Sequence, residues 1–220
     1  MQGRAEATRR SLLEAAAHLF NERGYAGTSI SDISELSGRT SGAVYFHYTS
    51  KEMLALAVVE AHFATWPQLI ERHDSARLPA LERLVRLSFA VARAFRDDIV
   101  VRAGARLWAE RKTINETLPT PFVGWIATVR RLMNQARSNG ELAPHVDPAR
   151  DAHSVVCAFF GLHTVSDALQ DRLGLVDQLA DLWLLLLPSL QAGADPAGLV
   201  ARARGPLPGA DRTPVGAGRP

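Results

Sequence analysis

The sequence predicts an all-α protein in which a three-helix unit at the N-terminus precedes a larger helical domain. Apolar residues recur at helical spacing along most of the chain, and no segment shows the apolar and polar alternation that is typical of a strand. Residues 28–51 are typical of two short helices joined by a tight turn. With 220 residues, 47% of them hydrophobic and 22% charged, the chain can bury a sizeable core.

The first helix is expected over residues 5–23. One face of this segment is apolar and carries Leu12, Ala16, Leu19 and Phe20. Gly24 should end the helix, because glycine readily adopts the left-handed conformation found after helix C-termini. This helix supplies the packing partner that two following short helices need, since helices of that length are unstable alone.

The two short helices have recognisable caps and a turn. Thr28 or Ser29 can cap the first helix by accepting a hydrogen bond from a free backbone N–H. Gly38 permits the sharp reversal, and Thr40 or Ser41 can cap the second helix. The three helices together predict a helix-turn-helix, a motif whose second helix enters the major groove of DNA.

This motif also predicts which residues meet DNA. A recognition helix presents its N-terminal residues to base edges, while flanking residues hold the phosphates. We therefore expect groove contacts from Arg39, Thr40, Ser41 and Gly42. Phosphate contacts are expected from Tyr45, His47 and Lys51.

The N-terminal segment resembles the DNA-binding domain of the TetR family of transcriptional repressors. The resemblance is carried by Gly24, Tyr25, Thr28, Ile33 and residues 42–48 and 50–52. It implies a DNA contact from Thr28 and supports those of Thr40, Tyr45, His47 and Lys51.

Two positions depart from the family pattern. Ser41 stands where the family often has a lysine, and Arg39 where it often has an apolar residue. Arg39 either restores the lost phosphate-directed charge, reads a guanine, or is a solvent-facing turn residue.

The rest of the chain resembles one branch of that family, the γ-butyrolactone autoregulator receptors. The similar segments are residues 58–67, 94–98, 102–107, 118–125 and 158–167. Aromatic residues from three expected helices suit a small-molecule pocket, or simply a packed core: Phe63, Trp66, Trp108, Phe122 and Trp125. The resemblance matches Trp125 with a pocket tryptophan and implies pocket positions for His62, Phe63, Trp108, Phe122 and Leu162.

The expected pocket is unusually apolar. Trp108, Phe122 and Leu162 stand at positions where relatives carry polar side chains, so the hydroxyls of a small polar lactone would be left unpaired. The apolar pocket positions and the basic pI of about 9.0 resemble those of the so-called pseudo-receptors, which respond to larger antibiotics or intermediates. The expected small-molecule effector is therefore of the γ-butyrolactone type or antibiotic-like.

Further helices are expected after residue 50, the first of them a long helix that Ser50 caps and that runs to about Arg72. The others cover residues 81–91, 99–111, 121–138, 148–170 and 175–190. We divide the chain into a helix-turn-helix DNA-binding domain at residues 1–50 and a ligand-binding and dimerisation domain at residues 51–190. Residues 191–220, rich in Gly, Pro, Ala and Arg, are expected to be a disordered tail.

The last two expected helices are apolar on more than one side. A helix that is apolar around most of its circumference must be buried on several sides. A homodimer sealed by a four-helix interface, as the resemblance implies, would bury them, and a fully internal helix of a monomer is the alternative. A two-fold dimer suits a pseudo-palindromic operator in double-stranded DNA.

Composition limits the compartment and the partners. The single cysteine, Cys157, excludes an internal disulfide and fits a reducing compartment. The first residues lack an apolar signal core, and the longest leucine run, residues 184–187, is too short to span a bilayer. We therefore expect a soluble cytoplasmic protein without a membrane partner.

The motifs give no support for catalysis. We find no phosphate-binding glycine loop, nucleophile elbow or zinc-spaced cysteine set. His153 with Cys157 and His163 with Asp167 share helical faces, but two ligands fall short of a metal site. The expectation is a regulator with no metal, cofactor or catalytic residues. The rival hypotheses are a small-molecule enzyme and an interaction protein, each with a vestigial DNA-binding head.

Overall fold

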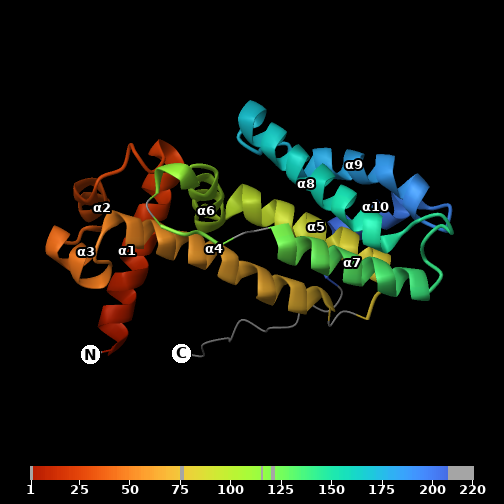
Figure 1. Cartoon of the computed structure of the whole chain (residues 1–220), viewed down its shortest axis with the longest axis horizontal. Helices are drawn as coiled ribbons and strands as arrows, with labels where there is room; N and C mark the ends of the chain where they lie inside the picture. The colour runs from red at the N-terminus through yellow and green to blue at the C-terminus, as the bar shows by residue number, and fades with distance from the viewer. Residues whose placement is uncertain (1, 75–76, 115, 120–121, 208–220) are drawn as a thin grey trace, which may run out of the picture. The chain divides into compact units, whose positions relative to one another are not determined.

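The computed structural model of the protein describes residues 2–74, 77–114, 116–119 and 122–207 (Figure 1). Every regular element in these ranges is helical, and Leu142 and Gln191 form an isolated antiparallel bridge. The prediction of an all-α fold is confirmed. The elements are α1 (Gln2–Arg23), α2 (Ile30–Ser37), α3 (Ser41–His47), α4 (Lys51–Asp74), α5 (Ala80–Asp97), α6 (Ile99–Ala109), the 3-10 helix η1 (Arg111–Thr113), α7 (Phe122–Ser138), α8 (Pro148–Gln170), α9 (Leu175–Leu190) and α10 (Pro196–Arg204).

The chain forms two compact units. The first contains the described residues within Met1–Gln68 and Ala94–Pro121, and the second those within Leu69–Arg93 and Phe122–Pro220. Helices α4 and α5 each contribute residues to both units, and α6 belongs to the first. This division differs from the boundary that we expected after Ser50, because α6 and the first part of α4 share a core with the helix-turn-helix.

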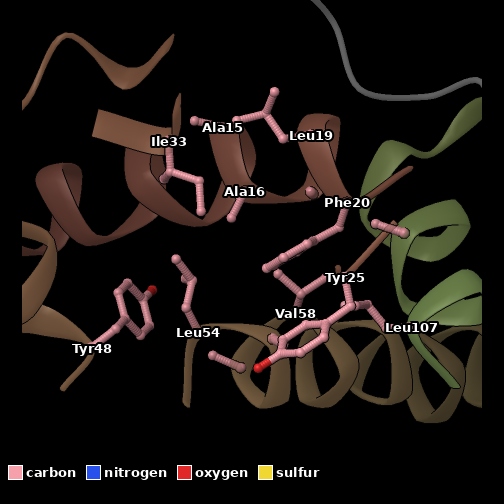
Figure 2. Packing of buried hydrophobic residues seen from close by; sticks show 14 of the residues in the cluster. Ala15, Ala16, Leu19, Phe20, Tyr25, Ile33, Tyr48, Leu54, Val58 and Leu107 are labelled. Atoms are coloured by element: carbon pink, nitrogen blue, oxygen red, sulfur yellow. The ribbon is translucent and has the colours of Figure 1, made fainter. Parts of the chain in front are cut away.

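The core of the first unit forms where α1 packs against the other helices (Figure 2). The face expected to be apolar on α1 is buried, with exposed fractions of at most 4% for Leu12, Ala16, Leu19 and Phe20. The other buried side chains include Ile33, Val44, Tyr48, Leu54, Val58 and Leu107. The two short helices are therefore held by their common core with α1, α4 and α6.

Local hydrogen bonds fix the starts of α2 and α3. Ser29 Oγ accepts from the N–H of Asp32 at 3.1 Å, and the Asp32 carboxylate accepts from the N–H of Ser29 at 2.9 Å. This reciprocal pair is a capping box. Thr40 Oγ1 accepts from the N–H of Ala43 at 3.2 Å. Ser29 and Thr40 are thus the caps, and Gly38 between them has the left-handed φ of 64° that the reversal requires.

The helices expected after residue 50 are present with similar boundaries, except that α5 continues to Asp97, beyond its expected end at residue 91. Ser50 Oγ accepts from the N–H of Met53 at 3.2 Å, which confirms Ser50 as the cap of α4. Gly140, with a φ of 71°, follows the end of α7. Asp147 caps α8, whose first residue is Pro148.

The second unit has its own core between α5, α7, α8 and α9. Its largest fully buried side chains are Phe89, Leu132, Met133, Leu175, Leu179 and Leu187. Two charged residues are also buried: Arg86 Nε donates to Glu82 Oε1 at 2.8 Å, and both side chains are less than 9% exposed. Such a pair is tolerated in a core only when its hydrogen bonds are satisfied.

The expectation of disorder after residue 190 is wrong for residues 196–204, which form α10. Asp195 Oδ1 accepts from the N–H of Gly198 at 2.8 Å and so caps this helix. Leu199, Val200 and Ala203 are buried. Composition alone does not reveal this helix, whose signals are the cap at Asp195 and the helical spacing of its buried residues. Residues 208–220 of the expected tail lie outside the described residues.

In the part of the chain that the structure describes, α4 is the one helix long and apolar enough to cross a membrane by length and composition. This is weak evidence, because core helices of soluble proteins meet the same criteria. Leu54, Ala55, Val58 and Val59 of α4 are 0% exposed within the core of the first unit. Packing inside the protein therefore accounts for these four apolar residues of α4.

Candidate DNA-binding surface and effector cavity

The start of α3 presents the residues expected to enter the groove. Arg39, Thr40, Ser41 and Gly42 are all exposed. On the opposite side of α3, Val44 is 0% exposed and points into the core. The outward face of this helix is therefore set by the burial of its inner face.

Two of the expected phosphate contacts lie further along α3. Tyr45 is 53% exposed and shares the outward face. His47 is half-buried, and its ring lies edge-on to that of Phe46 with a centroid distance of 5.2 Å. Tyr48, which we assigned to the interior, is 4% exposed, and its hydroxyl donates to the carbonyl oxygen of Arg9 at 3.1 Å.

Phe46 is a candidate that the sequence reasoning missed. Its side chain is 82% exposed on α3, beside Tyr45. A large apolar side chain so exposed contributes little to the core and is available to a partner. The available signal was its position four residues after Gly42, which puts both residues on one helical face.

Thr28 and Lys51 do not share that exposed face but meet in the turn between α1 and α2. Thr28 is 2% exposed, and its hydroxyl donates to the carbonyl oxygen of Gly24 at 2.9 Å. Lys51 Nζ donates to the carbonyl oxygens of Tyr25 and Thr28, both at 3.1 Å. The same ammonium lies 4.3 Å from the centroid of the Tyr25 ring. Both residues therefore hold the backbone from which α2 starts.

Tyr25 and Glu52 add a second link to this turn. The hydroxyl of Tyr25 donates to Glu52 Oε1 at 2.7 Å. Burial and this hydrogen bond raise the pKa of Tyr25, and the same hydrogen bond lowers the pKa of Glu52. Tyr25 is consequently a neutral donor and Glu52 a charged acceptor at physiological pH.

The second unit has a partly open cavity between α5, α7, α8 and α9. Its free volume is about 40 Å³, which is room for about three water molecules. No polar atom is exposed in it. The lining residues are Leu84, Leu87, Ser88, Val91, Trp125, Val129, Val155, Val156, Phe159, Phe160, Leu179, Leu182, Trp183 and Leu186.

One hydrogen-bonded pair stands in this apolar wall. Trp183 Nε1 donates to Ser88 Oγ at 2.7 Å, and the Ser88 hydroxyl donates to the carbonyl oxygen of Val85 at 2.7 Å. Both side chains thus have partners inside the protein. An apolar cavity with one polar pair is typical of a small-molecule site, in which a few polar groups fix the orientation of the ligand.

Of the seven residues expected to bind the effector, Trp125 lines this cavity and is 9% exposed. Phe122 lies beside the lining residue Phe160, with edge-to-face rings whose centroids are 4.9 Å apart. Leu162 is half-buried on α8 and does not line the cavity.

The other four belong to the first unit. His62 lies edge-on to Phe63 and Trp66, with ring centroids 5.1 and 5.0 Å away, and its Nδ1 is 3.0 Å from the carbonyl oxygen of Val101. Burial lowers the pKa of His62 to about 4, so the ring is neutral at physiological pH. Trp108 Nε1 donates to a loop carbonyl, that of Pro119, at 3.1 Å.

Helices α8 and α9 each carry two sets of apolar residues, one facing the cavity and one exposed. Some of their apolar residues line the cavity: Val155, Val156, Phe159, Phe160, Leu179, Leu182 and Leu186. Others are exposed, with fractions of 55% for Val165, 75% for Leu169, 42% for Leu184 and 75% for Leu185. Helical spacing alone could not separate these sets, because both recur with the same period.

The structure does not bring the residue pairs considered as metal ligands, His153 with Cys157 and His163 with Asp167, into a metal site. Arg172 Nε donates to His163 Nε2 at 3.1 Å, and Arg172 Nη2 lies 2.9 Å from Asp167 Oδ2. Cys157 is exposed. Over the ranges described by the structure, no three His, Cys, Asp or Glu side chains gather where they would hold a metal ion.

Two protein-family models match this chain. The model described as bacterial regulatory proteins of the tetR family matches residues 12–58, which include α2 and α3. The model described as a tetracyclin repressor-like C-terminal domain matches residues 78–192, which include all the cavity-lining residues. Helix α10 lies beyond both matches.

Individual relatives match along most of the chain. The A-factor receptor protein of Streptomyces griseus is 35% identical over 189 residues, which make up 86% of this chain and 66% of the receptor. A crystal structure of an ArpA-like γ-butyrolactone receptor has a TM-score of 0.77 at 33% identity, covering 91% of this chain and 98% of that one. CprB from Streptomyces coelicolor, solved with its biological operator sequence, has a TM-score of 0.79 at 32% identity, covering 92% and 99%.

These matches agree with the structure. The first family model covers the exposed recognition helix, and the second covers the helices around the cavity. The relatives are regulators and receptors rather than enzymes. The chain therefore belongs to the TetR family of bacterial regulatory proteins, with close similarity to the A-factor and γ-butyrolactone receptors.

Proposed function

We propose that this protein is a transcriptional repressor that binds a pseudo-palindromic DNA operator as a homodimer and is released by a small molecule. The observation that carries the proposal is the outward face of α3, whose groove-directed residues are all exposed while Val44 anchors the helix in the core. The operator complex of the similar protein CprB supports DNA as the partner.

On this face, the residues have different roles. Arg39 at the start of α3 suits a bidentate contact to guanine, and Tyr45 suits a phosphate. Lys51 donates two of its three ammonium protons to carbonyl oxygens in the turn, which leaves one for a phosphate oxygen. Thr28 contributes by holding the same turn. Phe46 is placed to contact thymine methyl groups or sugars.

Dimerisation rests on the exposed apolar side chains of α8 and α9. Val165, Leu169 and Leu185 are each more than half exposed. Exposed apolar residues grouped on long helices are typical of an interface between copies. A two-fold dimer would present two copies of α3 to two half-sites of the operator.

The effector is expected in the cavity of the second unit, against Trp125 and Trp183. Because no polar atom is exposed there, most of the effector surface must be apolar. The protons of Trp183 Nε1 and of the Ser88 hydroxyl are already donated within the protein, so the pair can only accept a hydrogen bond, at Ser88 Oγ, from a donor on the effector. A γ-butyrolactone-type signal with an alkyl chain or an antibiotic-like molecule meets this requirement. The sequence also predicts effector contacts from six other residues, and these contacts stay predictions: His62, Phe63, Trp66, Trp108, Phe122 and Leu162.

The cavity is too small for such a molecule without movement of its walls. An effector that binds the widened form shifts the population toward it. If the widened form holds the two recognition helices at a different separation, both half-sites cannot be met together, and the operator is released. As a repressor, the protein would act in the cytoplasm, where its operator lies. Its role would be regulatory and not enzymatic.

Gel shifts with duplexes selected from a random library test this function. Titration of a γ-butyrolactone, a butenolide, a furan and a polyaromatic antibiotic into the complex then identifies the effector class. We expect the larger molecules to release the DNA. Release by the smallest lactone alone would contradict the preference for a larger effector, and failure to bind any duplex would contradict the repressor itself.

A further inference from the structure

The end of α1 is held by two charged residues of the α6 region. Glu110 Oε2 accepts from the N–H of Tyr25 at 2.7 Å. Arg106 Nη1 donates to the carbonyl oxygens of Asn21 at 2.6 Å and Glu22 at 3.2 Å. The cation thus meets the carbonyl end of α1, and the carboxylate meets the N–H of Tyr25, two residues beyond the helix. The dipole of α1 favours the cation at this end of the helix, and the N–H of Tyr25 gives the carboxylate a hydrogen-bond donor.

The two side chains also hold each other. Arg106 Nε donates to Glu110 Oε1 at 3.1 Å, one helical turn apart. Their side chains are 39% and 31% exposed. An ion pair with this much solvent access adds little to stability, so it can separate at small cost.

Gly24 makes room for this pair. A Cβ atom at residue 24 would lie 2.6 and 2.9 Å from the two carboxylate oxygens of Glu110, and 3.0 Å from Arg106 Nη2. The φ of 72° at Gly24 independently favours glycine. The close approach of the pair to the backbone is therefore a built feature of the turn and not an incidental surface contact.

The peptide groups of Tyr25 are held from two helices. Glu110 binds the N–H of Tyr25, and Lys51, at the start of α4, binds its carbonyl oxygen. The turn leads directly to Ser29, which caps α2. Loss of the Glu110 contact would leave this turn held by Lys51 and by the hydrogen bond from the Thr28 hydroxyl to the carbonyl oxygen of Gly24.

We propose that Arg106 and Glu110 are positioning residues through which α6 sets the placement of α2 and α3. In the chain, α6 follows α5 directly, and residues 84–91 of α5 contribute to the cavity wall. Asp98 Oδ1 accepts from the N–H groups of Val100 and Val101 and so caps α6. Helix α6 is therefore continuous in the chain with a helix of the cavity wall. The inference rests on the proposed function, which makes operator binding the output.

A distance measurement within one subunit tests the positioning role without DNA. In a Cys157→Ser background, spin labels at Ser41→Cys and Glu60→Cys measure the distance between α3 and α4. Labelled protein is diluted into unlabelled protein so that only distances within one subunit are measured. Glu110→Ala and Arg106→Met should each broaden or shift the distance distribution, while Glu110→Gln, which keeps an oxygen acceptor for the Tyr25 N–H, stays close to wild type. The matched controls, Glu116→Ala and Lys112→Met, change exposed charges beyond α6 and should leave the distribution unchanged.

Operator affinity of the unlabelled variants is the second readout. Glu110→Ala and Arg106→Met should weaken binding by about ten-fold with little change in melting temperature, as expected when a partly exposed charge-assisted contact is lost. Wild-type distances and wild-type affinity in both variants would overturn the proposal. If the wild-type protein bound no duplex, the repressor function would fail, and the distance measurement would still decide the positioning role. If one variant failed to fold, the other would decide.

Discussion

The ammonium nitrogen of Lys51 lies 3.1 Å from the carbonyl oxygen of Thr28, so two residues expected to contact DNA are hydrogen-bonded to each other. Together they hold the turn between α1 and α2, and Thr28 is buried. Changes at either residue therefore alter the fold of the DNA-binding head as well as its surface. A change at exposed Tyr45 alters the surface alone.

We expect Tyr45→Ala and Lys51→Ala to weaken operator binding for different reasons. Tyr45→Ala should reduce affinity with an unchanged melting temperature. Lys51→Ala should also lower the free energy of unfolding by about 1–2 kcal/mol, because two backbone carbonyls lose their donor. For Lys51→Ala, the slope of log affinity against log salt concentration should become less steep by about one, because one phosphate contact is lost. Gel shifts across a salt series, paired with denaturation curves, check both variants, and unchanged gel shifts would refute the assignment.

Phe46→Ala should reduce operator affinity about three- to ten-fold and relax the preference for thymine at one position of each half-site. Its stability should change by less than about 0.5 kcal/mol, because the ring is 82% exposed. Binding to a panel of single-base operator variants measures the effect. Val123→Ala, which removes a 69% exposed side chain from α7, is the control and should bind normally. Identical binding profiles for the two variants would exclude a DNA contact by Phe46.

Ser88→Ala should destabilise the second unit by about 1–3 kcal/mol, because the indole N–H of Trp183 then faces the apolar cavity without its acceptor. Urea denaturation measures the loss. Ser138→Ala, an exposed serine on α7, serves as the control and should unfold like the wild type. Equal midpoints for both variants would show that the buried pair contributes nothing.

Leu199→Ala should lower the free energy of unfolding by about 2–3 kcal/mol, because the side chain is 4% exposed between α10 and the rest of the unit. Release of α10 would also strip Arg86 of two acceptors, the carbonyl oxygens of Gly205 and Pro206. The exposed substitution Ala201→Ser is the control. A wild-type denaturation midpoint in Leu199→Ala would contradict a packed α10.

Stability should fall as the pH drops from about 6.5 to about 4, in part through His62. Burial lowers the pKa of His62 to about 4 in the folded protein, whereas the unfolded chain takes up the proton near pH 6.5. The contribution of about 3 kcal/mol is therefore complete above pH 6.5 and is lost toward pH 4.

Melting temperatures across this pH range test the assignment. His62→Phe should flatten the decline, because phenylalanine fills the aromatic cluster without titrating. His18→Gln, a change at an exposed histidine, should keep the wild-type slope. The same slope in all three proteins would assign the acid sensitivity to other groups.

Local features of the sequence determined much of this protein. Helix starts at Ser29, Thr40 and Ser50 and the reversal at Gly38 depend on hydrogen bonds and backbone preferences within a few residues. The apolar face of α1 follows from helical periodicity, and the exposed start of α3 follows from the helix-turn-helix motif. These interactions are readable because both partners are close in the chain. The family resemblance then supplied the class of function.

Contacts between distant residues were decided by the tertiary structure. Periodicity marks Phe159 and Leu185 alike as apolar, yet one lines the cavity and the other is exposed, because their partners are on other helices. The pairing of Glu110 with the N–H of Tyr25 joins residues 85 positions apart, and no local pattern encodes it. Lys51 likewise became a support of the turn only when α4 packed beside it. The sequence by itself determined the helices and their caps, and their packing determined what each exposed or buried side chain can do.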